Sequence, residues 1–312
     1  MAKKTRARVA ATAGDNPRRP CPCGSGRRYK ACHGAGDDVI VTRPFEGLAA
    51  ECDLVAMRVF LPSATAPLPL RDTGGRTVTV ATVLPGASAA LVRPDGEILL
   101  GMQVQTRSGD LSSDLARALN WALTSEPGTA LPVVGPGLGA DPARLQDVLD
   151  GDAALDLTLH TDFGWWVSEA DAARPSPEVV ATLERANSVI VPTEAIAADG
   201  VRAAYWVDTG SKAHLRWVRP ESEERLLAAL ARLHARGELG LGEDTRYAGA
   251  FRAHGLLVPV WDLDRDQHAK EWIGPVAAFA ARLDAALAED SPLTDAQRRA
   301  RDALAGKQVT LR

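Results

Sequence analysis

The 312-residue sequence lacks any apolar run close to the ~18 residues that a membrane-spanning helix needs. Its first residues, MAKKTRARVAATAGD, include basic side chains but not the apolar segment of a secretory signal. We therefore expect a cytoplasmic protein with no membrane span.

Several catalytic motifs are also missing. The phosphate loop of many ATPases has the pattern Gly-x-x-x-x-Gly-Lys-[Ser/Thr], and neither Gly210-Ser211-Lys212 nor Gly306-Lys307-Gln308 has this spacing. The chain contains no Gly-x-Ser-x-Gly nucleophile elbow and no His-Glu-x-x-His metal motif. The sequence thus excludes an ATPase motor of the phosphate-loop type and favours a non-enzymatic protein. An enzyme with a catalytic site of another kind in the body is the remaining alternative.

Cysteine is scarce, but its placement is informative. Only four cysteines occur, and Cys21, Cys23 and Cys32 fall within twelve residues, directly before His33. Three thiolates and one imidazole fill the tetrahedral shell of a structural zinc site and leave no position for water. We therefore predict that Cys21, Cys23, Cys32 and His33 bind one Zn²⁺, and that the metal folds this short segment. The fourth cysteine, Cys52, is expected to be a small apolar residue on a helix.

Charge is distributed unevenly along the chain. Residues 1–34 hold nine basic residues against Asp15 alone, a net charge of +8, so the rest must carry −12 to give the total of −4. Residues 1–20 have no apolar periodicity and are predicted to be a disordered basic arm. Such an arm would attract a polyanion, or it is simply a solvated tail.

A resemblance to a known family rests on residues 21–34. The run Cys21-Pro22-Cys23-Gly24-Ser25-Gly26, then Tyr29-Lys30, then Cys32-His33-Gly34, resembles the SEC-C motif found at the C-terminus of the preprotein-translocase ATPase. The resemblance implies zinc binding by the same four ligands and docking on a protein, with chaperones and ribosome-associated proteins as the expected partners. The whole chain also resembles a bacterial family of unknown function that has an N-terminal SEC-C motif.

The rest of the chain is predicted to be an α+β body. After the arm at 1–20 and the zinc knuckle at 21–34, the Gly-rich stretch that begins at Gly34 reads as a linker, and the body spans 39–312 with room for two subdomains. Residues 88–102 predict a hairpin around Pro94-Asp95-Gly96, followed by a helix capped by Ser112 or Ser113.

A second hairpin-then-helix unit is predicted further along the chain. Residues 203–207 and 214–218 flank a turn, and a helix from about Ser222 ends at Gly237. Four more segments complete the expected body: strands at 156–167, 188–191 and 256–261, and a helix at 177–187. Two final helices begin near Pro275 and at Thr294, where Gln297 completes a capping box.

Two weaker patterns in the body are candidate ligand sites. Gly135 to Gly139, with Ala140, fits the dinucleotide pattern Gly-x-Gly-x-x-[Gly/Ala], but Asp141-Pro142 would start the next helix too late to face a phosphate. Asp262 to Asp266 contains alternating carboxylates that suit a magnesium ion or a catalytic pair, or else a solvated turn. The seven tryptophans, Trp165-Trp166 included, are expected in the core rather than in a ligand groove.

These patterns favour a zinc-binding SEC-C adaptor or interaction protein. A nucleic-acid or ribosome-associated protein that binds through the basic arm is the first alternative. An enzyme with an unidentified site in the body is the second.

Overall fold

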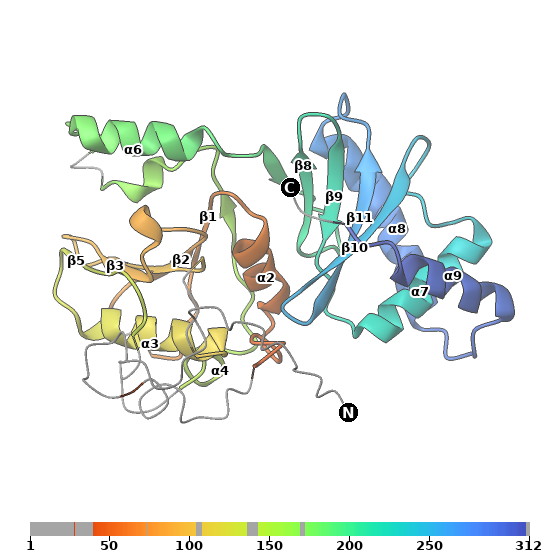
Figure 1. Ribbon diagram of the computed structural model, residues 1–312, viewed down its shortest axis with the longest axis horizontal. Helices are drawn as coiled ribbons and strands as arrows, with labels where there is room; N and C mark the ends of the chain where they lie inside the picture. The colour runs from red at the N-terminus through yellow and green to blue at the C-terminus, as the bar shows by residue number, and fades with distance from the viewer. Residues whose placement is uncertain are drawn as a thin grey trace, which may run out of the picture.

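The computed structural model describes residues 28, 40–72, 74–103, 108–135, 143–168 and 172–309. Within these residues the chain is α+β, with seven α-helices and two β-sheets (Figure 1). This confirms the α+β class predicted for the body. The predicted arm at 1–20 and zinc knuckle at 21–34 lie outside the described residues, apart from Arg28.

The first sheet has the strand order β5-β3-β4-β2-β1-β6. Its strands are β1 (Ala64–Pro67), β2 (Val78–Ala81), β3 (Ala90–Val92), β4 (Ile98–Gly101), β5 (Thr129–Leu131) and β6 (Thr158–Leu159). Neighbouring strands are antiparallel except β2 and β4, which run parallel. Strands β3 and β4 form the predicted hairpin, and Gly96 in its turn has a φ of 93°.

Three helices accompany this sheet: α2 (Glu51–Val59), α3 (Leu111–Thr124) and α4 (Leu145–Val148). Helix α3 buries Leu115 and Leu119, as its four-residue spacing predicts. The predicted caps at Ser112 and Ser113 are wrong, because the carboxylate of Asp110 accepts a hydrogen bond from the Ser112 amide and begins the helix earlier.

The second sheet has the order β10-β11-β9-β8-β7 and is antiparallel throughout. Its strands are β7 (Thr193–Ala195), β8 (Ala204–Asp208), β9 (Ala213–Trp217), β10 (Arg246–Ala253) and β11 (Leu256–Leu263). Strands β8 and β9 are the second predicted hairpin. The strand predicted at 256–261 is the first part of β11.

One face of the second sheet is covered by α7 (Glu223–Arg236), α8 (Ile273–Leu287) and α9 (Asp295–Ala305), with the short helix η3 (Ala269–Trp272) leading into α8 (Figure 1). The predicted ends of α7 are confirmed: Ser222 caps its start, and Gly237 closes it with a left-handed conformation. The capping box of Thr294 and Gln297 at the start of α9 is confirmed as well.

The second sheet takes part in two hydrophobic cores. Side chains alternate along β8, so that Tyr205 and Val207 pack with the first core while Trp206 packs with the second. Phe60, next to the end of α2, places its ring 5.7 Å from Tyr205 and 6.2 Å from Phe251. The sheet is therefore a wall common to both cores.

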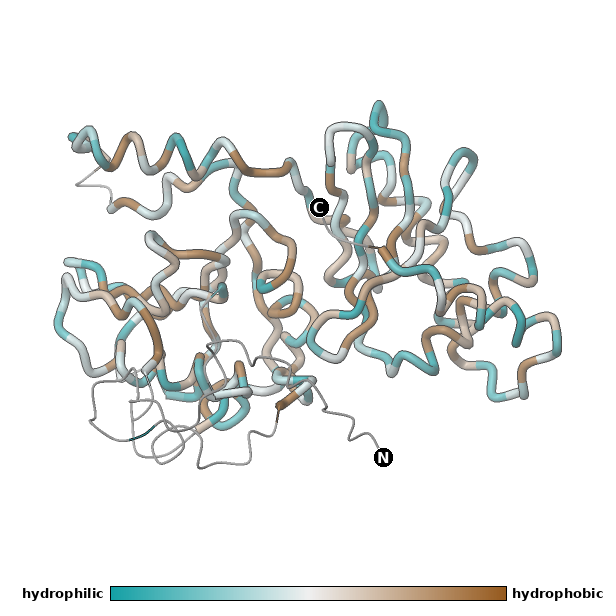
Figure 2. The backbone as a smooth tube through the Cα atoms, in the orientation of Figure 1, coloured by the Kyte–Doolittle hydropathy of each residue, from teal (hydrophilic) through white to brown (hydrophobic). Residues whose placement is uncertain are grey.

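Helix α6 (Pro177–Asn187) lies on the opposite side of the first sheet from α3 and α4 (Figure 1). Apolar and polar residues alternate along it (Figure 2), yet none of its residues is buried. It follows the short helix η2 (Gly164–Trp166), while η1 (Pro85–Ala87) belongs to the loop between β2 and β3.

Two strand predictions near α6 are wrong. Of the segment 156–167, only Thr158–Leu159 is a strand, because the chain then turns into η2, where two tryptophans bond to the sheet through their indole N–H groups. The strand expected at 188–191 is replaced by β7, which begins at Thr193 and pairs with β8.

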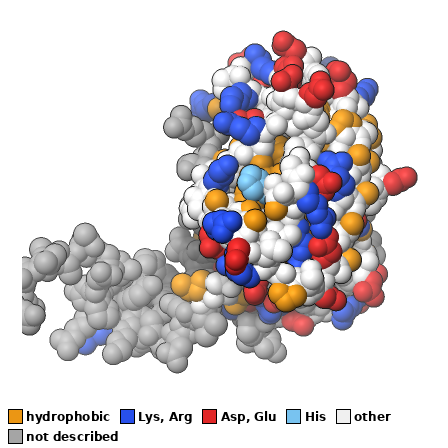
Figure 3. Space-filling model, turned by 90° about the vertical axis from the view of Figure 1, so that its right-hand side faces the viewer, with side chains coloured by type: hydrophobic (Ala, Val, Ile, Leu, Met, Phe, Trp, Pro, Cys, Tyr) orange, Lys and Arg blue, Asp and Glu red, His pale blue; other side chains and the backbone are white. Residues whose placement is uncertain are grey.

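The surface at the right-hand side of Figure 1 has Lys and Arg side chains interspersed with Asp and Glu (Figure 3). This face therefore offers no broad field of one sign to a polyanion. Among the residues given above, no helix has both the length and the hydropathy needed to cross a membrane.

Candidate ligand-binding cleft

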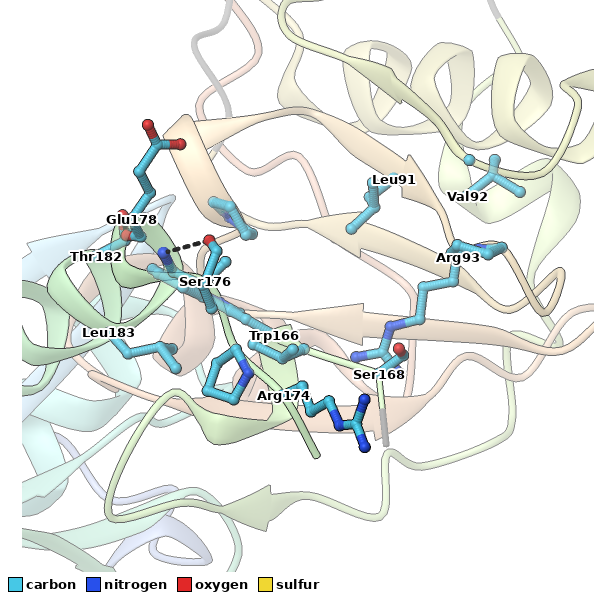
Figure 4. A pocket seen from close by; sticks show the side chains of 16 residues that line it. Leu91, Val92, Arg93, Trp166, Ser168, Arg174, Ser176, Glu178, Thr182 and Leu183 are labelled. Carbon is cyan, nitrogen blue, oxygen red and sulfur yellow. Dashed lines mark hydrogen bonds between the residues drawn. The ribbon is translucent and has the colours of Figure 1, made fainter. Parts of the chain in front are cut away.

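A cleft of about 640 Å³ lies between the first sheet and α6. Leu91 and Arg93 line it from the sheet, Trp166 from η2, and Val179 and Leu183 from α6 (Figure 4). Ser176 fixes the start of α6, because its hydroxyl accepts a hydrogen bond from the Val179 amide at 3.3 Å (Figure 4). The cleft is thus walled mainly by apolar side chains.

Both neighbouring tryptophans are tied to the first sheet and its loops by their indole groups. Trp165 Nε1 donates to Ser63 Oγ at 2.8 Å, and Trp166 Nε1 donates to the Val83 carbonyl at 2.9 Å. Phe163 packs against Trp166 with ring centroids 4.4 Å apart, and its amide donates to Asn187 Oδ1 at the end of α6. These contacts hold the floor of the cleft in one geometry.

Two basic groups line the cleft, Arg93 and Arg174, and Arg93 is the one with hydrogen-bond partners among the described residues. Its Nη1 lies 2.5 Å from Glu97 Oε2, and its Nη2 donates to the Trp165 carbonyl. Glu97 also accepts a hydrogen bond from Thr79 Oγ1 at 3.0 Å. The Nε of Arg93 is buried and has no acceptor in the part of the chain that the structure describes.

A second cavity of about 530 Å³ adjoins the first, and Arg93 and Val167 line both. Thr65 lines this second cavity, and its hydroxyl lies 2.8 Å from His160 Nε2. Burial lowers the pKa of His160, although the charge of Asp162 opposes the shift. A neutral imidazole beside a hydroxyl is the start of a catalytic pair, but no carboxylate among the described residues hydrogen-bonds to this imidazole.

His160, His214 and His254 make stability depend on pH, since burial is the largest cause that lowers the pKa of each. The unfolded chain, with a histidine pKa of about 6.5, then binds protons more readily than the folded chain. We expect stability to be highest above about pH 6.5 and to fall as the pH drops below that value. Melting temperatures between pH 7.5 and 5 measure this slope. A variant with His→Gln at all three positions should flatten it; an unchanged slope would contradict the assignment.

The comparisons with known proteins place the chain in a family. A family model described as "Family of unknown function (DUF5926)" matches residues 44–312. The chain belongs to the DUF5926 family. A second model, the SEC-C motif, matches residues 20–35. No curated protein and no solved structure matches.

The SEC-C match agrees with the motif identified from the sequence, and SEC-C is in general a zinc-binding motif. The predicted ligands Cys21, Cys23, Cys32 and His33 lie outside the described residues, so their zinc site stays a prediction. In the described part of the DUF5926 body, no three His, Cys, Asp or Glu side chains group as a metal site.

The predicted carboxylate site at Asp262 to Asp266 has a different role. Asp262 lies 2.8 Å from Lys212 Nζ, 2.9 Å from Arg246 Nη2 and 3.3 Å from His214 Nδ1. Burial acts to raise the pKa of Asp262, but hydrogen bonds from Lys212 and Arg246 help to bring it below its ordinary value. Asp264 accepts a hydrogen bond from the Asp266 amide, which is the solvated-turn arrangement. Asp262 is thus paired with basic groups and Asp264 lies in a turn, which favours the solvated-turn alternative for this segment.

The dinucleotide pattern is only partly placed. Gly135 is described, whereas residues 136–142, which include Gly137 and Gly139, are not. The preceding strand β5 is a three-residue edge strand, antiparallel to β3, whereas dinucleotide folds place this loop after a parallel strand. The body therefore does not provide the expected surroundings for that motif.

The sequence prediction missed the cleft itself. It placed all tryptophans in the core, which is right for Trp217 and Trp261, but Trp165 and Trp166 are half-buried and line the two cavities. Arg93 was not singled out. The available signal was the apolar spacing of Val179 and Leu183 on a partly polar helix, in the segment that follows a Trp-Trp pair.

Proposed function

We propose that this chain is a zinc-binding interaction protein. Its SEC-C segment would hold one Zn²⁺ through Cys21, Cys23, Cys32 and His33 and dock on a protein partner. The observation that carries the proposal is the SEC-C match at residues 20–35, which contains all four ligands. A closed set of four ligands has no place for water, so the metal serves to fold the segment and not to hydrolyse a substrate.

The proposed partner is a chaperone or a ribosome-associated protein. The basic residues that precede and surround the motif give residues 1–34 a net charge of +8, which attracts an acidic surface over a long range. The zinc-folded segment would then supply the specific contacts.

The DUF5926 body supports recognition better than catalysis. The described walls of its cleft are mainly apolar, and Arg93 is paired with Glu97. Thr65 and His160 approach each other, and no carboxylate in the described part of the chain hydrogen-bonds to the imidazole. Such a surface suits the binding of a ligand or a protein segment.

Metal content and partner capture test the proposal together. We expect wild-type protein to contain one zinc per chain by mass spectrometry, and the double variant Cys21→Ser/Cys23→Ser to contain none, because two of four ligands are lost. Pull-down from lysate should lose the bound partner in the same variant. Cys52→Ser is the matched control: Cys52 lies on α2, and this variant should keep both the zinc and the partner.

Three outcomes would contradict the proposal. Wild-type protein without zinc would remove the metal site. Zinc lost while the captured partner is unchanged would move recognition into the body. The captured partner could instead prove to be a nucleic acid whose affinity falls steeply with added salt. The basic arm would then be the binding element, and nucleic-acid or ribosome association would replace the adaptor function.

A further inference from the structure

We propose that the cleft beneath α6 binds an extended acyl chain that ends in a carboxylate. This ligand site belongs to the body, and it does not depend on the zinc segment. It rests on three features of the described residues: an unfilled apolar space, a buried donor without an acceptor, and an unequal distribution of charge along the cleft.

The apolar space is the first feature. Helix α6 directs Leu183 to the cleft, opposite Leu91 of the sheet and beside Trp166 (Figure 4), and Val179 lines the cleft as well. An amphipathic helix normally buries its apolar face against a sheet, yet no residue of α6 is buried. The volume of about 640 Å³ between them is of the size that small-molecule ligands occupy. An acyl chain along Trp166 and Leu183 would complete this layer.

The buried donor is the second feature. Arg93 has two of its nitrogens bonded, to Glu97 and to the Trp165 carbonyl, while its Nε is buried with no acceptor from the described residues. A buried N–H group without an acceptor is unfavourable, and buried polar groups in proteins are normally satisfied. Nε has almost no accessible surface in this state, so a ligand carboxylate would meet the guanidinium where Arg93 lines the cleft, and a small shift of the side chain would give Nε its acceptor.

Charge is the third feature, and it orients the ligand. Arg174 is exposed at the cleft and makes no ion pair with any residue in the described ranges. Figure 4 shows Arg93 and Arg174 on one side of the cleft and Glu178 on the other. A carboxylate therefore belongs at the two arginines, with the acyl chain extending away from them toward Leu183 of α6.

Equilibrium dialysis of the full-length protein with radiolabelled dodecanoate, below its micelle-forming concentration, tests this site. We expect saturable binding of one dodecanoate per chain, and much weaker binding of dodecyltrimethylammonium, which has the same chain and the opposite charge. Arg93→Gln should weaken binding by about tenfold, and the exposed Arg174→Gln by about threefold. Arg185→Gln, on α6 but outside the cleft lining, should change binding by less than about twofold.

A matched pair on α6 separates the cleft from general apolar adhesion. Leu183 lines the cleft, whereas Val180 is 39% exposed and does not line it. Leu183→Asp should weaken dodecanoate binding by about tenfold or more, while Val180→Asp should leave it within about twofold. Neither residue is buried, so both variants should fold.

The proposal is overturned if dodecanoate does not bind, if dodecyltrimethylammonium binds equally well, or if Leu183→Asp and Val180→Asp bind dodecanoate alike. The Cys21→Ser/Cys23→Ser variant should bind dodecanoate as the wild type does. This comparison separates the ligand site from the adaptor function, because either proposal can fail without contradicting the other.

Discussion

Replacement of Trp261 by alanine is expected to lower the free energy of unfolding by about 3–5 kcal/mol, as is typical for a large aromatic residue removed from a core. Trp261 on β11 is fully buried, with its ring centroid 5.1 Å from Phe279 on α8 and 5.4 Å from Tyr247 on β10. Its Nε1 donates to the Leu239 carbonyl at 2.9 Å, so the variant also leaves a buried acceptor without its donor. Equilibrium denaturation in urea measures the loss.

The matched control for this variant is Trp166→Ala. Trp166 is half-buried beside the cleft and packs mainly on Phe163, so its removal creates a smaller cavity that opens to solvent. We expect a clearly smaller loss than at Trp261. Equal losses of unfolding free energy at the two positions would contradict the expectation that the buried contacts of Trp261 stabilise the protein more than the half-buried contacts of Trp166.

Gly101→Ala should destabilise the protein by about 1–3 kcal/mol, the range seen when a well-packed interior is overfilled. Gly101 ends β4 in the first sheet, and a Cβ atom there would lie 2.6 Å from the Ser88 carbonyl oxygen and 3.3 Å from Leu84 Cγ. The nearer contact is with backbone, which cannot move aside by a change of rotamer. Thermal or urea unfolding detects the change.

Gly274→Ala is the opposite case and serves as the control. Gly274 is in the first turn of α8, and a Cβ atom built on it meets no atom within 4 Å from residues outside its own helical turn and chain neighbours. Alanine favours helix over glycine by up to about 1 kcal/mol, whereas Pro275 disfavours a helical residue with a Cβ directly before it, so this variant should change stability by clearly less than Gly101→Ala does. A loss at Gly274 equal to that at Gly101 would contradict the steric explanation.

Local signals in the sequence predicted much of the fold. The turn at Pro94-Asp95-Gly96 located β3 and β4, and Ser222 and Gly237 located both ends of α7, because capping and turn chemistry act over only a few residues. The capping box at Thr294 was read correctly for the same reason. Strand pairing between segments far apart in the sequence could not be predicted in this way. The residues of Ala90–Gly101 do not indicate that β4 also pairs in parallel with β2.

The cleft was not predicted, and the reason is physical. The apolar residues around Trp165-Trp166 suit a strand as well as a turn, and the choice is made by hydrogen bonds to Ser63 and Val83, which are far away in the sequence. The helix predicted at 177–187 is confirmed as α6, but a helical pattern does not tell whether an apolar face is buried or left beside a cavity. Asp262 was noticed for its carboxylate, while its basic partners come from β9, β10 and the turn before β9, which only the paired sheet brings together.

The position of the second sheet between two cores has a consequence for the order in which the protein is made. Tyr205, Phe251 and Val260 complete the first core, whose other members begin at Phe45. When only the first sheet and its helices have emerged from the ribosome, the first core is therefore incomplete. The apolar side of α2 near Phe60 is then still exposed to water. Folding during synthesis would have to wait until β11 has emerged, so that both halves reach their native packing late and together.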